Sequence, residues 1–120
     1  MKPKVDQNIV NALLELPDEL VNFSGVKVKI REKKRNDESG IEHIALSRHG
    51  LKVKDIKEIP NIILKPNRYC KDRKRKNRVA YYGIRAGKKK NSFLKIIAKE
   101  NKDKSQTIIT IFTCKTIRNN

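Results

Sequence analysis

The apolar and polar positions along the chain predict elements in the order α, β, α, α, β, β, β. The first helix follows from a stripe of four apolar residues at helical spacing: Ile9, Val10, Leu13 and Leu14. Asp6 stands where a helix cap is expected, and Pro17 ends the helix. Residues 26–30 then alternate strictly between Val or Ile and Lys, which predicts a half-buried strand whose lysines face water.

Two further helical segments follow a polar run. Ser39 and Glu42 form a capping box and Gly50 is a C-terminal stop, so we expect a helix over residues 40–49. Residues 55–58 offer a weaker box before a second helical stripe: Ile56, Ile59, Ile62 and Ile63. Pro60 must break this helix, which we expect to end before Pro66.

The last third of the chain is rich in aromatic and β-branched residues, and predicts strands over residues 79–85, 93–99 and 107–115. The polar turns between them are short, so the strands should pair antiparallel as a meander. We therefore expect one α+β domain, with helices packed on one face of a small sheet.

The composition points to a polyanionic partner. The chain has 30 Lys and Arg against 13 Asp and Glu, which gives a net charge of +17. Repulsion among these charges is relieved when the protein binds a polyanion. Nucleic acid is the first candidate, and an acidic protein or an anionic membrane surface comes next. No apolar stretch reaches 18 residues, and the N-terminus lacks the apolar core of a signal peptide, so we expect a cytoplasmic protein without membrane insertion. Cys70 and Cys114 lack metal-ligand spacing and are expected to be reduced, although one bridge stays possible.

The charge is concentrated in residues 65–90, the basic segment, which holds twelve Lys or Arg and one acid, Asp72. The residues expected to bind RNA are Lys71, Arg73, Lys74, Arg75, Lys76, Arg78, Arg85, Lys88, Lys89 and Lys90. Tyr69, Tyr81 and Tyr82 interleave with them and could stack on unpaired bases. In the alternative interpretation the lysines are simply solvated and the tyrosines belong to the core of the sheet. No segment carries the Arg, Asn and Gln pattern of a base-reading helix.

Two histidines raise the question of catalysis. His43 and His49 have an ordinary pKa near 6.5, which suits a group that takes and gives a proton at neutral pH. Both fall on the helix expected over residues 40–49, about 120° apart around an ideal helix. In the alternative interpretation they are structural, His49 because a cation at a helix C-terminus is favourable by itself.

A resemblance strengthens the catalytic interpretation. The run IEHIALSRHG (residues 41–50), the run IKEIPNIILKPN (residues 56–67), the Tyr81-Tyr82 strand and the closing strand with Thr110 and Phe112 occur in this order. Together they are similar to the barnase, EndoU, colicin and RelE-like nuclease superfamily, in its phage-associated and polymorphic-toxin branches. Phe112 stands where that pattern often has Tyr, which removes one hydroxyl.

The resemblance spans about residues 41–118 as a nuclease-like core and implies a helical layer over an about four-stranded antiparallel sheet, to which residues 1–40 would add a helix and a strand. It also implies a metal-independent ribonuclease toxin that needs no cofactor and leaves a 2′,3′-cyclic phosphate. It makes His43 and His49 the acid and base candidates, Arg48 a phosphate clamp and Thr110 a hydroxyl on the phosphate, with Arg78 or Arg85 as further cations. It also implies an acidic immunity or antitoxin protein, which would be steered to the basic segment. The alternatives are a non-catalytic RNA- or DNA-binding module and a basic protein that binds an acidic partner.

Overall fold

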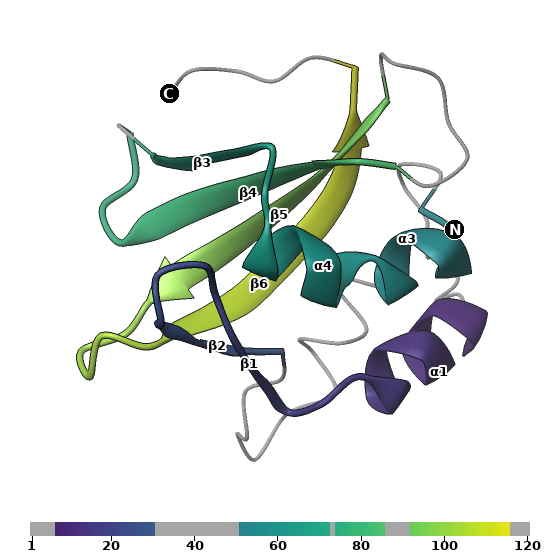
Figure 1. Ribbon diagram of the computed structural model, residues 1–120, viewed down its shortest axis with the longest axis horizontal. Coiled ribbons are helices and arrows are strands. Elements are labelled where there is room, and N and C mark those ends of the chain that lie inside the picture. The colour runs from purple at the N-terminus through teal and green to yellow at the C-terminus, as the bar shows by residue number, and fades with distance from the viewer. Residues whose placement is uncertain (1–6, 31–50, 73, 86–91, 116–120) are drawn as a thin grey trace, which may run out of the picture.

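The computed structural model describes residues 7–30, 51–72, 74–85 and 92–115 (Figure 1). In chain order these form α1 (Gln7–Glu15), β1 (Glu19–Val21), β2 (Lys27–Lys29), α3 (Val53–Lys57), α4 (Ile59–Leu64), β3 (Arg68–Lys71), β4 (Arg78–Ile84), β5 (Phe93–Glu100) and β6 (Gln106–Cys114). The expected α+β class is confirmed. The helix expected over residues 40–49 lies outside the described residues.

The strands form one six-stranded sheet in the order β1-β2-β6-β5-β4-β3. The antiparallel meander of β4, β5 and β6 is confirmed. The expectation of a four-stranded, wholly antiparallel sheet is wrong, because β2 pairs in parallel with β6 and two short strands, β1 and β3, extend the edges. Both additional strands are only three or four residues long, and their partners rather than their own sequences make them strands.

The first helix forms where its apolar stripe predicts it. Ile9, Ala12 and Leu13 are buried, whereas Leu14 is 53% exposed, so the buried stripe is narrower than the sequence suggested. The helix ends at Glu15, two residues before Pro17. The backbone N–H of Leu16 then donates to the carbonyl of Leu13, which tightens the last turn.

The second helical segment is broken, as expected, between α3 and α4. Pro60 lies in the first turn of α4, where its missing N–H costs no hydrogen bond. The expected cap was misplaced: Asp55 lies inside α3, and its carboxylate accepts the backbone N–H of Lys52 at 2.8 Å. This bond satisfies one of the free N–H groups at the start of α3 and moves that start to Val53.

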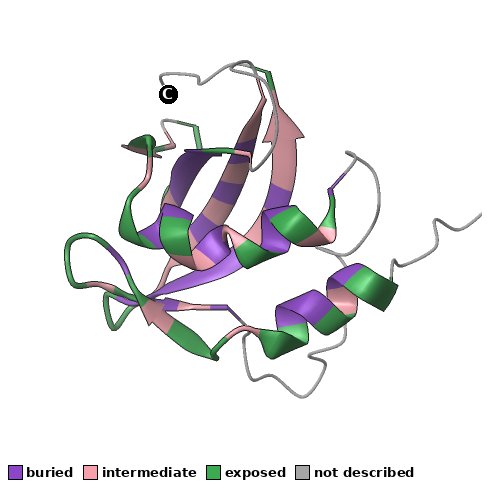
Figure 2. Cartoon of the chain, turned by 45° about the vertical axis from the view of Figure 1, so that its right-hand side comes forward, coloured by how far each residue is buried: buried purple, intermediate pink, exposed green. Residues whose placement is uncertain are grey.

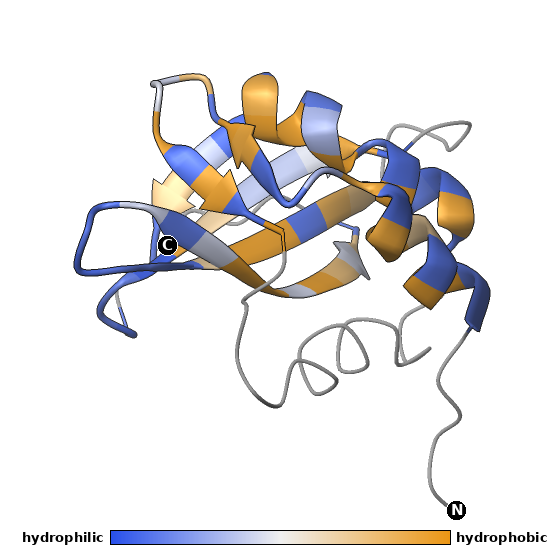
Figure 3. Cartoon of the chain, turned by 90° about the horizontal axis from the view of Figure 1, so that it is seen from below, coloured by the Kyte–Doolittle hydropathy of each residue, from blue (hydrophilic) through white to orange (hydrophobic). Residues whose placement is uncertain are grey.

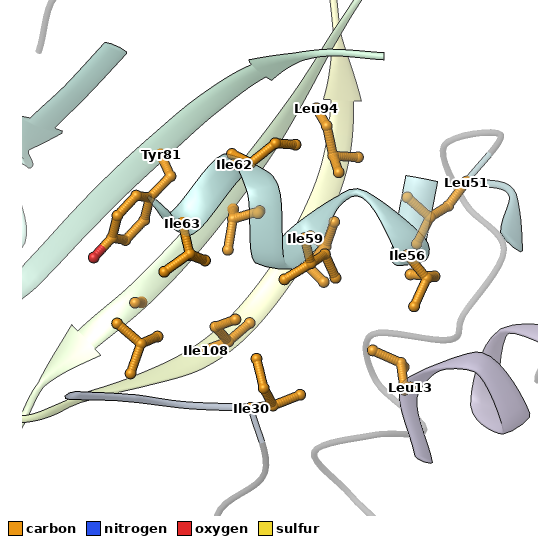
Figure 4. Packing of buried hydrophobic residues seen from close by; sticks show 14 of the residues in the cluster. Leu13, Ile30, Leu51, Ile56, Ile59, Ile62, Ile63, Tyr81, Leu94 and Ile108 are labelled. Carbon is orange, nitrogen blue, oxygen red and sulfur yellow. The ribbon is translucent and has the colours of Figure 1, made fainter. Parts of the chain in front are cut away.

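The hydrophobic core lies between the helices and one face of the sheet, as Figures 2 and 3 show from two sides. Ile59, Ile62 and Ile63 of α4 pack over the sheet, where Tyr81, Leu94 and Ile108 face them (Figure 4). Each such isoleucine contributes about 1.5–3 kcal/mol by leaving water. Leu13 and Ile30 belong to the same cluster, so the N-terminal helix and strand are part of one core.

Among the described residues, no helix is long and apolar enough to cross a membrane.

Candidate nucleic-acid interface

The sheet has an inner face, covered by α1, α3 and α4, and an outer face on its other side (Figure 3). Val79, Tyr81, Leu94 and Ile96 belong to the core cluster and therefore point to the inner face. Because side chains alternate along a strand, the residues between them, such as Lys95, point to the outer face.

The strand register brings four outer-face side chains into one row, which we call the central row: Arg68, Tyr82, Lys95 and Phe112. The Lys95 ammonium lies 5.2 Å from the centroid of the Tyr82 ring and 5.4 Å from that of Phe112. Both distances are within the range of cation–π attraction. The rings therefore hold this cation near the middle of the face.

A second row lies toward the end of the sheet at which β4 begins. We call it the end row: the three cations Arg78, Lys99 and Lys29, from β4, β5 and β2, together with the buried Thr107 of β6. Tyr82 and Arg78 are four residues apart on β4, so the two rows are separated by about 13 Å. The outer face thus carries cations in two parallel rows.

Uncharged side chains lie between the two rows: Cys70, Ala80, Ile97 and Thr110. Thr110 is the one expected catalytic residue that the structure describes, and it is half-buried on the outer face. His43, Arg48 and His49 lie outside the described residues. An anionic chain that lay along this row would be flanked on both sides by positive charge.

The loop between β3 and β4 extends this positive surface. Lys74, Arg75 and Lys76 are exposed in it, and Arg73 lies outside the described residues. The Asp72 carboxylate accepts the backbone N–H groups of Lys74 at 2.8 Å and Arg75 at 3.3 Å. Both hydrogen bonds lower the pKa of Asp72, and the one from Lys74 has the larger effect. The single acid of the basic segment therefore shapes the loop that presents the cations.

Tyr81 and Tyr82 are 0% and 1% exposed, so neither ring offers an open surface to a base. The Tyr81 hydroxyl donates to Oε1 of Gln106 and accepts from Nδ2 of Asn22 at 2.9 Å. Burial raises the pKa of Tyr81 to about 12. The half-buried Tyr69 packs edge-to-face on Tyr81. These observations favour the alternative that the tyrosines are structural, with Tyr82 holding Lys95.

Arg85 does not belong to the outer surface either. Its guanidinium forms two hydrogen bonds with the Asp55 carboxylate, Nε to Oδ1 at 2.9 Å and Nη2 to Oδ2 at 2.8 Å. The two side chains are 9% and 3% exposed. The expectation that Arg85 stabilises charge on a phosphate is corrected accordingly: it ties the end of β4 to α3. Residues 88–90 lie outside the described ranges.

Sequence reasoning missed three outer-face cations because they lie outside the basic segment: Lys29, Lys95 and Lys99. For two of these lysines, the alternation of residues 93–99 did indicate an outward position. Lys95 and Lys99 fall on the positions opposite to Leu94, Ile96 and Ala98, so a buried inner face requires these lysines to point outward.

The described residues contain no group of three His, Cys, Asp or Glu side chains that could hold a metal ion. Cys70 and Cys114 are half-buried, on β3 and β6, with two strands between them.

Comparison of the chain with family models, with curated proteins and with solved structures found no match.

Proposed function

We propose that the protein binds RNA across its outer face and cleaves it as a metal-independent endoribonuclease. The observation that best supports binding is the pair of cationic rows, which gathers residues far apart in the sequence, such as Lys29 and Lys99, on one side of the sheet. The basic loop at residues 74–76 continues the same surface at the start of β4.

Such a surface suits a sugar–phosphate backbone rather than particular bases. Lysine and arginine neutralise phosphates and release condensed counterions, whereas reading bases requires donors and acceptors directed at base edges. The outer-face residues are mainly cationic, aromatic or small. Binding should therefore weaken steeply with salt and depend little on sequence, by about 0.7 in log K per tenfold rise in salt for each phosphate contacted.

The cleavage step of the proposal uses His43 and His49, as the resemblance implies. One neutral imidazole takes the proton of the ribose 2′-hydroxyl while its oxygen bonds to phosphorus, and one imidazolium gives a proton to the departing 5′-oxygen. The products are a 2′,3′-cyclic phosphate and a free 5′-hydroxyl. Arg48, Arg78 and the Thr110 hydroxyl would bind the phosphate oxygens as charge builds up on them. Arg85 no longer has a part in this step.

The test is incubation of the purified protein with total RNA in EDTA, followed by analysis of the new RNA ends. Cyclic-phosphate ends that disappear in His43→Ala or His49→Ala support the enzyme. RNA that stays intact but is retained in a salt-dependent way refutes cleavage and leaves a non-catalytic RNA- or DNA-binding module. Absence of retention at low salt refutes both and leaves an acidic protein as the partner.

The proposal also includes an acidic immunity protein. A carboxylate-rich surface would be attracted to the two cationic rows and would exclude RNA from them. Competition between such a protein and RNA for the purified chain tests this part.

A further inference from the structure

We propose that Lys95 binds one phosphodiester of the RNA backbone, and that the rings of Tyr82 and Phe112 position its ammonium for this contact. The inference rests on the proposed RNA binding and assigns a specific site within it.

The first argument is location. Lys95 lies on β5, which has neighbours on both sides in the sheet, and its register partners Tyr82 and Phe112 belong to the two adjacent strands. Arg68 is next in the same row. The lysine therefore occupies the middle of the outer face, whereas Lys74, Arg75 and Lys76 extend from a loop at its end.

The second argument is order. A solvated lysine gives up rotamer entropy when it is fixed on a ligand. The Lys95 ammonium already lies between two rings, at 5.2 and 5.4 Å from their centroids. Part of the ordering has thus taken place before the anion arrives, which favours binding at this position over the exposed loop.

The third argument is the chemistry of the ammonium. Cation–π attraction leaves the three N–H donors of an ammonium available for hydrogen bonds. The charge of Lys95 already acts on a nearby carboxylate, since it is, after the backbone hydrogen bond from Lys74, one of the smaller causes that lower the pKa of Asp72. Phosphodiester oxygens are singly charged acceptors that fit the same donors.

The matched variants are Lys95→Gln and Lys57→Gln. Both remove one positive charge, but Lys57 is an exposed residue of α3, away from the outer face. Binding of a fluorescent single-stranded RNA is measured between low and high salt. For Lys95→Gln we expect the slope of log K against log salt to fall by about 0.7 and the affinity at 0.1 M salt to fall about fivefold. For Lys57→Gln we expect less than a twofold change.

Two more variants separate positioning from charge. Phe112→Leu keeps every charge but removes one ring, so the affinity should fall about two- to fivefold while the salt slope stays the same. Lys95→Arg keeps both the charge and the cation–π geometry, and should restore most of the affinity that Lys95→Gln loses. Thermal unfolding of each variant, measured in parallel, shows that the fold is intact.

A second measurement decides the site independently of RNA. Inorganic phosphate is titrated into the isotope-labelled protein, and amide chemical shifts are followed by NMR. Shift changes that centre on Tyr82, Lys95 and Phe112 and vanish in Lys95→Gln support the site. Changes centred on residues 74–76 overturn it, as does RNA binding in which Lys95→Gln matches Lys57→Gln. A wild-type chain that binds phosphate at Lys95 but no RNA overturns the proposed function alone.

Discussion

Breaking the ion pair between Arg85 and Asp55 should destabilise the fold and leave RNA binding intact. The pair is almost fully buried, at 9% and 3% exposure, and its two hydrogen bonds measure 2.9 and 2.8 Å. Removing one member leaves the other as an uncompensated charge in the interior, which costs about 3–5 kcal/mol. The perturbations are therefore Arg85→Met, which keeps the length of the side chain, and Asp55→Asn, which keeps an acceptor for the N–H of Lys52.

The size of the effect can be expressed as a melting temperature. Unfolding entropy is about 2.1 cal/mol/K per residue, so a chain of this length has about 0.25 kcal/mol/K. A loss of 3–5 kcal/mol then lowers Tm by about 12–20 °C. In the double variant with Asp55→Asn and Arg85→Met, neither charge remains, and the loss should be smaller than the sum of the two single losses by 2 kcal/mol or more.

The assays are calorimetry or urea unfolding for stability and RNA affinity at a temperature where every variant is folded. We expect Arg85→Met to bind RNA within twofold of the wild-type chain. The reasoning is refuted if the single variants melt within 3 °C of the wild type, or if folded Arg85→Met loses RNA affinity as Lys95→Gln does. The second result would return Arg85 to the binding surface, where the sequence alone had placed it.

Three further predictions test the packing, the buried hydroxyl and the loop. In Gly83→Ala the added Cβ would overlap the Ile62 side chain of α4, so Tm should fall by about 4–12 °C. Adding Ile62→Ala to the same chain should recover part of this loss. An unchanged Tm in Gly83→Ala contradicts this packing. In the native protein one phenol, absent in Tyr81→Phe, should ionise near pH 12, because burial raises the pKa of Tyr81 from 10.0 to about 12. Because folding favours the protonated phenol, the contribution of Tyr81 to stability is complete below pH 10 and is lost as the pH rises through about 12. Phenolate absorbance measures the ionisation of this phenol in the native and in the unfolded protein. Asp72→Asn keeps an acceptor for the N–H of Lys74 and removes a negative charge, so its RNA affinity should rise above that of the wild type. Asp72→Ala also removes the acceptor, so it should bind RNA less tightly than Asp72→Asn. Equal affinities of the two variants would show that the loop needs no such hydrogen bond.

The parts of the fold that the sequence predicted are those decided by local patterns. The stripe of Ile9 and Leu13, the break at Pro60 and the β-branched run of β6 need no knowledge of distant partners. By contrast, β1 and β3 are only three and four residues long, and the parallel pairing of Val28 with Gln106 joins positions at opposite ends of the chain. Such pairing depends on tertiary packing, which local propensity does not contain.

The candidate site was predicted only in part, for the same reason. Density of charge along the chain drew attention to residues 65–90, yet the register removes Arg85 from the surface and adds Lys95 and Lys99 to it. Nor could the sequence show that Tyr82 lies beside Lys95, because cross-strand neighbours are set by register. Linear charge density located Arg78 and the loop residues 74–76, but it included Arg85 and left out Lys95 and Lys99.

One-sided packing explains why this sheet can carry so much positive charge. The inner face supplies the hydrophobic core, as the burial of Leu94, Ile96 and Ala98 shows for β5. The outward positions of the same strand are then free to vary without loss of core, and they hold Lys95 and Lys99. Repulsion among these cations opposes folding, and screening by salt or neutralisation by phosphates relieves it. The protein therefore gains stability from the same ions or polyanions that its outer face attracts, while salt that relieves the repulsion must also weaken its hold on RNA.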